Sequence, residues 1–241
     1  MQEENRFNVA TEVPYGHIAK PAAYATLMRN VYLWMTLALF MTGMTAYYVS
    51  NSYDIMNFVF SSQAVFFGFI IAELALVWGM SAFINRISFP VAGIIFAIYS
   101  ILNGITLSVV FIAYAEATII TAFFTTAGTF GALALFGTIT KRDLSMVGRI
   151  AFMALIGLII ASVVNIFWGN GIMDLVISYA GVLIFTGLTA YDAQKIKNLL
   201  LEHGTEENDS TLKIALLGSL TLYLDFINLF LYILRLLGRK D

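Results

Sequence analysis

Long apolar stretches separated by short polar segments dominate the chain, and their spacing predicts about seven membrane-crossing helices. The hydrocarbon core of a bilayer is about 30 Å thick, so a helix needs roughly 20 apolar residues to cross it. The apolar runs lack the alternation of lipid-facing and lumen-facing residues that a membrane β-strand carries, so helices are expected. The predicted spans lie at residues 31–50, 63–84, 89–112, 117–139, 146–168, 173–191 and 211–237.

Composition assigns the chain to the integral membrane class and excludes several kinds of chemistry. Of 241 residues, 60 % are hydrophobic and 12 % are charged, which is too few polar side chains to cover a water-facing surface. The formal net charge of -2 leaves no basic face for nucleic acid, and the absence of cysteine removes disulfides and thiolate chemistry. Because no phosphate-binding glycine loop, Ser/His/Asp set or zinc-binding His pair is recognisable, we expect no bound cofactor and no enzyme activity.

Loop charges predict an orientation. The tail at residues 1–28 starts with Glu3 and Glu4 rather than with basic residues, so it is not a signal peptide, and residues 29–241 form the predicted transmembrane domain. Along the chain, segments with basic residues alternate with loops that contain only acidic residues. Basic loops stay in the cytoplasm, and the segment before the first span is basic, so we expect a cytoplasmic N-terminus. The basic positions are Lys20, Arg29, Arg86, Lys141, Arg142, Arg149, Lys195, Lys197 and Lys213, and the acidic ones are Asp54, Glu116 and Asp174.

The C-terminal end conflicts with this rule. A seventh crossing would place Arg235, Arg239 and Lys240 outside the cytoplasm. The last segment therefore either crosses despite its charges or bends back as a re-entrant element, and the sequence leaves both alternatives open.

Three carboxyl groups lie within the apolar spans: Glu73, Asp192 and Asp225. An ionisable group at such a depth costs several kcal/mol unless it is paired or hydrated, so each is a candidate for function. Asp192 and Asp225 lie at similar distances on either side of the loop between the last two spans, so antiparallel helices would bring them to similar depth. Two such carboxyl groups are expected to share a proton or to bind a divalent cation such as Ca²⁺.

Other polar residues in the spans give weaker indications. Asn103, Thr106 and Ser108 in the third span could line a hydrated path, but such side chains more often bond a neighbouring helix.

Two motifs near the C-terminus resemble the signature of the transmembrane Bax inhibitor motif family, also called Bax inhibitor type one. The first is AYDAQKI, which contains Asp192, and the second is SLTLYLDFINLFLYILRLLG, which contains Asp225. The start of the first span, Glu73, the NGITLS segment and FGTITKRDLS also fit, so the resemblance covers nearly the whole chain. The short tails are similar to those of bacterial members.

The resemblance implies a seven-helix bundle with the last helix at its centre, and a pH-sensitive calcium leak across the bacterial inner membrane. It implies that Asp192 and Asp225 share a proton and act as the pH sensor, that Glu73 lines the route, and that Arg86 is the candidate for an arginine that latches onto the sensor. The expected partners are the lipid bilayer, Ca²⁺ and protons, with no nucleic acid; no partner-protein motif is present.

Three other functions are open alternatives. An intramembrane aspartyl protease also uses two aspartates, but Leu222-Tyr223-Leu224-Asp225 replaces the Gly-x-Gly-Asp that its second half requires. A retinal pigment needs a lysine deep in the last helix, whereas Lys213 lies at the start of that helix. An interaction protein that suppresses cell death is compatible with a leak.

Overall fold

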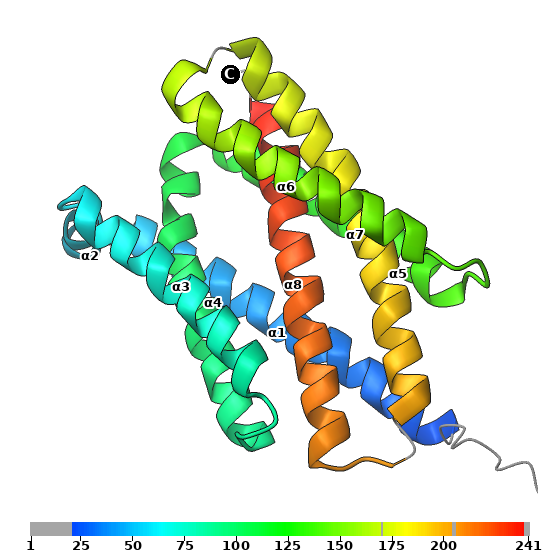
Figure 1. Ribbon diagram of the computed structural model, residues 1–241. Coiled ribbons are helices and arrows are strands. Elements are labelled where there is room, and N and C mark those ends of the chain that lie inside the picture. Colours follow the sequence, from blue (N-terminus) through cyan, green and yellow to red (C-terminus); the bar gives the residue numbers. More distant parts are fainter. Residues whose placement is uncertain (1–20, 170, 204–205, 239–241) are drawn as a thin grey trace, which may run out of the picture.

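The computed structural model describes residues 21–169, 171–203 and 206–238, and these form eight helices without a strand (Figure 1). Most of the predicted tail, together with Lys20, Arg239 and Lys240, lies outside the described residues. The helices are α1 (Pro21–Ser50), α2 (Tyr53–Val59), α3 (Gln63–Phe83), α4 (Phe89–Ala113), α5 (Glu116–Ile139), α6 (Ser145–Trp168), α7 (Gly171–His203) and α8 (Asp209–Leu237).

A helix is present at each of the seven predicted apolar stretches, and six helices are long and apolar enough to cross a membrane. These six are α3 to α8. Helix α1 falls short by composition, because Thr, Tyr and Trp are interspersed among its apolar residues, and it begins at Pro21, within the predicted tail. The chain is therefore an all-helical, multi-pass membrane protein, and six spans are identified by length and apolarity.

Two helices differ from the sequence-based expectation. Helix α7 continues past residue 191 to His203, because Ile196 and Leu200 face inward and are buried in the core. The short α2 lies between α1 and α3, and its Val59 is buried. A seven-residue helix of this kind is too short to give an apolar stretch of membrane-crossing length.

Helix α8 occupies the centre of the bundle. In its apolar window 67 % of the residues are buried, against 6 % in α3 and 11 % in α6. Its main contacts are with α1, α4, α5 and α7, whereas α3 packs chiefly on α4, and α6 packs on α7 (Figure 1). Helix α8 is therefore surrounded mainly by four helices, and not by all six of the other predicted spans.

The uninterrupted path of α8 decides between the two alternatives for the last segment. The Asp209 carboxylate accepts a hydrogen bond from the Phe89 backbone N–H at 3.0 Å, so α8 starts beside the start of α4. A Cβ placed on Gly238 would contact the ring of Tyr114, which ends α4. Helix α8 thus runs the whole length of α4 and does not bend back.

The start of α8 is fixed by side-chain capping. Asn208 accepts a hydrogen bond from the Thr211 backbone N–H at 3.1 Å, and the Thr211 hydroxyl accepts one from the Asn208 N–H at 3.0 Å. This reciprocal pair satisfies backbone donors that the first turn of a helix would otherwise leave unpaired. It fixes the residue at which α8 begins.

Close contact between α1 and α4 depends on Gly104. A Cβ at this position would lie 2.6 Å from the Thr42 carbonyl oxygen and 2.7 Å from the Thr45 Cβ. Only a glycine fits there without moving one of the helices, as is common where helices pack closely within a membrane. The approach brings the Thr42 side chain against α4.

Candidate functional site

Asp192 of α7 and Asp225 of α8 lie together in the middle of the bundle. Their carboxyl groups are close enough for a hydrogen bond between them. Asp225 is 5 % exposed, and its Oδ2 has no hydrogen-bond partner among the described residues, whereas Asp192 is half-buried. Since an ionised carboxylate can only accept, one of the pair must be protonated for the bond to form. The structure thus brings together the two aspartates paired by sequence, in a geometry suited to a shared proton.

Asp192 is the member of the pair that solvent reaches. It lines a cavity of about 340 Å³ together with Val77 and Ser81 of α3 and Thr221 of α8. It also lines a second cavity of about 750 Å³ on the α6 side, which Arg149 borders. Asp225 lines neither cavity, so Asp192 separates it from both.

The cation next to the pair is Lys195, one turn after Asp192 on α7. Its charge favours the ionised form of Asp192, and its Nζ lies 6.0 Å from the centre of the Tyr191 ring. Lys195 lines both cavities. The sequence places Lys195 and Lys197 beside Asp192 near the end of the predicted span, and the structure puts Asp192 and Lys195 on one continuous helix.

Arg86, the predicted latch, lies in the exposed turn between α3 and α4. Its guanidinium carbon is 5.9 Å from the centre of the Phe83 ring. Within the described part of the chain it forms no ion pair with Asp192 or Asp225. In this conformation Arg86 is not engaged with the pair, and its role stays a prediction.

Gln194 fixes the position of α7 at the level of the pair. Its side-chain oxygen accepts a hydrogen bond from the Leu144 N–H at 2.8 Å, and its amide nitrogen donates one to the Arg142 carbonyl oxygen at 2.8 Å. Both backbone groups belong to the turn between α5 and α6, and Gln194 is 7 % exposed. Because Asp192 and Gln194 lie within one turn of α7, Gln194 ties the helix that carries Asp192 to the turn between α5 and α6.

Glu73 lies apart from the pair, on the side of α3 that faces α4. Its Oε2 accepts a hydrogen bond from the Asn103 amide at 3.1 Å, and its Oε1 accepts one from the Thr106 hydroxyl at 2.8 Å. Asn103 and Thr106 thus bond a neighbouring helix, which is the more common of the two roles expected for them. Glu73 is also one helix turn from Val77, so it continues the α3 face that lines the 340 Å³ cavity.

A hydroxyl network extends from Asn103 into the core, and sequence reasoning missed it. The Tyr223 hydroxyl donates to Asn103 Oδ1 at 2.9 Å and lies 2.7 Å from Thr42 Oγ1. The Thr42 hydroxyl is also 2.9 Å from the Ser100 carbonyl oxygen, which can accept its proton. The network joins α1, α3, α4 and α8, and the apolar sequence around Tyr223 does not indicate the partners of its hydroxyl.

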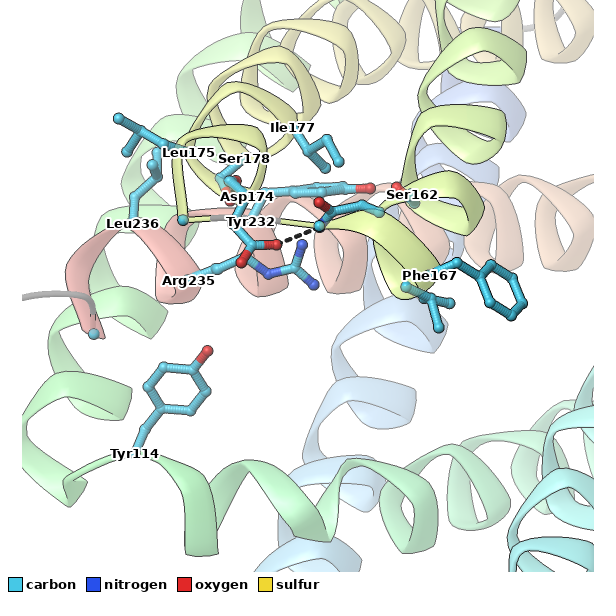
Figure 2. Close-up of a pocket in the computed structure, with 15 residues that line it drawn as sticks. Tyr114, Ser162, Phe167, Asp174, Leu175, Ile177, Ser178, Tyr232, Arg235 and Leu236 are labelled. Carbon is cyan, nitrogen blue, oxygen red and sulfur yellow. Dashed lines mark hydrogen bonds between the residues drawn. The ribbon is translucent and has the colours of Figure 1, made fainter.

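A further polar cavity of about 960 Å³ lies where α4, α6, α7 and α8 meet, at the opposite end of α8 from Asp209 (Figure 2). Asp174 and Arg235 both point into it (Figure 2). Asp174 accepts a hydrogen bond from the Asn165 amide at 2.5 Å, and the Arg235 guanidinium lies 5.7 Å from the centre of the Tyr232 ring. Arg235, in the last turn of α8, therefore lies in a polar cavity that the Asp174 carboxylate also lines. These surroundings reduce the free-energy cost of placing its charge at this end of the helix.

The described residues contain no group of three or more His, Cys, Asp or Glu side chains that could hold a metal ion. Ca²⁺ in proteins takes six to eight oxygen ligands, and the Asp192–Asp225 pair supplies only part of such a shell. The two carboxyl groups alone therefore do not complete a Ca²⁺ coordination shell.

Comparison with known proteins gives consistent matches over the same residues. The family described as "Inhibitor of apoptosis-promoting Bax1" matches residues 25–241. The chain is 46 % identical over 219 residues to "Inner membrane protein YbhL" of Escherichia coli K12, which covers 91 % of this chain and 94 % of that protein. It is 42 % identical over 188 residues to an uncharacterized membrane protein of Streptococcus pyogenes serotype M1, covering 78 % of this chain and 80 % of the relative.

Proposed function

Since the chain belongs to the Bax inhibitor family of membrane proteins, we propose that it is a pH-sensitive calcium leak channel gated by the Asp192–Asp225 pair. One observation carries the proposal: two carboxyl groups from adjacent helices meet inside the bundle, and Asp225 Oδ2 is buried without a partner. A buried acid of this kind is rare in membrane helices and is typical of proton relays and ion pathways.

The gating mechanism is electrostatic. With one shared proton, the pair carries one negative charge and holds α7 and α8 together through the hydrogen bond between the carboxyl groups. When that proton leaves, two like charges lie in a poorly solvated site and repel each other. Separation of α7 and α8, or entry of a cation, relieves the repulsion, so the leak opens as the pH rises.

The route begins at the cavity that Asp192 and Lys195 line. Ser81 and Val77 line this cavity, and Glu73 follows Val77 at the same interval of four residues on α3, one helix turn beyond the lining residues. Its carboxylate and the Thr106 hydroxyl oxygen are hard oxygen donors of the kind Ca²⁺ prefers. Glu73 is therefore placed to accept a cation after the pair.

We place the protein in a bacterial inner membrane with its N-terminus in the cytoplasm and with α1 as a seventh span. The relative from E. coli is named an inner membrane protein. Helix α1 packs on α4 and α8, and its outward side chains are apolar, as a lipid-facing surface requires: Leu33, Leu37, Phe40 and Met44.

The test is Ca²⁺ entry into dye-loaded proteoliposomes as a function of pH. The wild type is compared with Asp192→Asn, Asp225→Asn and the double variant, and Asp54→Asn in the exposed part of α2 is the matched control. We expect wild type and Asp54→Asn to show the same pH-dependent flux, and the dyad variants to lose the pH dependence.

Folded wild-type protein that passes no Ca²⁺ at any pH would overturn the channel proposal. Substrate cleavage that Asp225→Asn abolishes would then favour the aspartyl protease alternative. Partner binding without either activity would favour an interaction protein.

A further inference from the structure

The Thr42–Tyr223–Asn103 network contains fewer protons than contacts. Thr42 and Tyr223 each carry one hydroxyl proton. Three contacts compete for these two protons: Thr42 with the Ser100 carbonyl oxygen, Thr42 with Tyr223, and Tyr223 with Asn103. One of the three contacts must therefore lack a hydrogen at any moment.

Two arrangements place a proton in the short 2.7 Å contact between Thr42 and Tyr223. In the first, Tyr223 donates to Asn103 and Thr42 donates to Tyr223. In the second, Tyr223 donates to Thr42, and Thr42 donates to the Ser100 carbonyl oxygen. In both arrangements Tyr223 on α8 is hydrogen-bonded to Thr42 of α1, and only in the first is it also bonded to Asn103 of α4.

The charge on Glu73 selects between these arrangements. While Asn103 donates to an ionised Glu73, its amide is polarised and its own oxygen becomes a stronger acceptor. Tyr223 then bonds Asn103. When a proton or a passing cation neutralises Glu73, the Asn103 oxygen becomes a weaker acceptor and Thr42 competes successfully for the Tyr223 proton.

A hydrogen bond lost from this relay leaves a buried hydroxyl or amide oxygen with one partner fewer. Tyr223 is 0 % exposed and Thr42 is 3 % exposed, so water does not compensate for a lost bond. The titratable groups whose charge reaches Glu73 are Tyr99 of α4 and Tyr223 of α8, and those that face Asp225 are Asp192 and Lys195 of α7.

We propose that Tyr223 is a positioning residue for the Glu73 site, and that its hydroxyl transmits a change at Glu73 to the helix that carries Asp225. The inference deepens the proposed function, in which Glu73 lies on the ion route. Under this proposal the charge on Glu73 and the protonation of the Asp192–Asp225 pair depend on each other, because both sites contact α8.

The first test measures how fast a hydrophobic carbodiimide labels Glu73 at different pH values in reconstituted protein, with the labelled peptide identified by mass spectrometry. Tyr223→Phe removes the donor to Asn103, whereas Thr42→Val removes the competing acceptor and leaves Tyr223 on Asn103. We expect the two variants to move the pH profile in opposite directions, each by about half a pH unit, as the loss of one hydrogen bond implies.

Phe96→Leu is the matched control, because Phe96 packs edge-on against Tyr223 with ring centres 5.8 Å apart, is equally part of the core and carries no titratable group. We expect it to leave the profile unchanged. Tyr223→Phe and Thr42→Val profiles that move in the same direction, or not at all, would overturn the proposal, since general loosening of the core predicts the former.

The second test is a double-mutant cycle on the same readout. Asp225→Asn should shift the Glu73 labelling profile in the wild-type background, and this shift should disappear when Tyr223→Phe is also present. A shift of equal size in both backgrounds would show direct electrostatic coupling and overturn the relay. Neither test needs ion flux, so absent Ca²⁺ flux with these shifts intact would remove the channel proposal and still support the role of Tyr223.

Discussion

Tyr223 and Asp225 lie two residues apart on α8 and project from opposite sides of the helix. Residues at this spacing are separated by roughly 200° around a helix axis. Tyr223 faces Thr42 of α1 and Asn103 of α4, while Asp225 faces Asp192 of α7. A rotation of α8 that changes one polar site must therefore change the other.

Substitution of Gly104 by Ala should destabilise the protein. The added Cβ would lie 2.6 Å from the Thr42 carbonyl oxygen, so α1 and α4 must separate at a cost of about 1–3 kcal/mol. Thermal unfolding in detergent, followed by circular dichroism, should show a lower midpoint. Gly43→Ala is the control, because its Cβ would meet no atom within 4 Å, and equal midpoints for the two variants would contradict the close approach.

Gln194→Ala should loosen the junction between α7 and the turn between α5 and α6. The variant leaves the Leu144 N–H and the Arg142 carbonyl oxygen without their partner, at a cost of about 1–3 kcal/mol for the Leu144 N–H, which is the buried one of the two groups. Hydrogen exchange at the Leu144 amide should become faster. Asn198→Ala, an exposed position one turn later on α7, should leave exchange unchanged. Unaltered exchange in Gln194→Ala would mean that this junction does not depend on the side chain.

Asp143 should support the start of α6 only above acidic pH. Hydrogen bonds from Ser145 lower the pKa of this carboxyl group below 3.8, and its carboxylate accepts from the Ser145 N–H at 2.9 Å. A carboxyl group whose pKa is lower in the folded than in the unfolded protein stabilises the fold. This stabilisation is complete above the unfolded-state pKa of 3.8 and is lost as the pH falls through the lower pKa of the folded state. Asp143→Ala should therefore exchange amide hydrogens faster than wild type in the first turn of α6 at pH values near neutrality. A difference of the same size in strong acid would be evidence against this assignment.

Single cysteines can establish how α8 crosses, since the natural chain contains none. Ser210→Cys and Leu237→Cys mark the two ends of α8 and should react with a membrane-impermeant thiol reagent from opposite sides of the membrane. Asn85→Cys, in the exposed turn between α3 and α4, is the control and should react from the same side as Ser210→Cys. Labelling of both α8 positions from one side would contradict a full crossing.

The sequence predicted the helices well because hydropathy over about 20 residues depends on composition alone. It also predicted that Asp192 and Asp225 would meet, since their distances from one loop fix their depth in an antiparallel pair. It placed Lys195 beside Asp192 at the end of a span, but it did not predict that α7 continues as a helix to His203.

The hydroxyl network was not predictable for a different reason. Thr42 and Tyr223 are 181 positions apart, and their contact depends on how α1 and α8 are rotated about their axes. Hydropathy gives almost no information on rotation in helices that are apolar on all sides. Gly104 is the one local sign, since it marks where α1 approaches α4, but a glycine alone does not name the facing residue.

Helix α3 combines a small buried surface with an important side chain. Only 6 % of its apolar window is buried, and it packs chiefly on α4, so most of its surface is in contact with lipid. Glu73, which lies on α3, nevertheless accepts hydrogen bonds from Asn103 and Thr106 of α4. Changes in bilayer thickness or lateral pressure therefore act directly on the helix that carries Glu73, which makes the mechanical state of the membrane an input to this site.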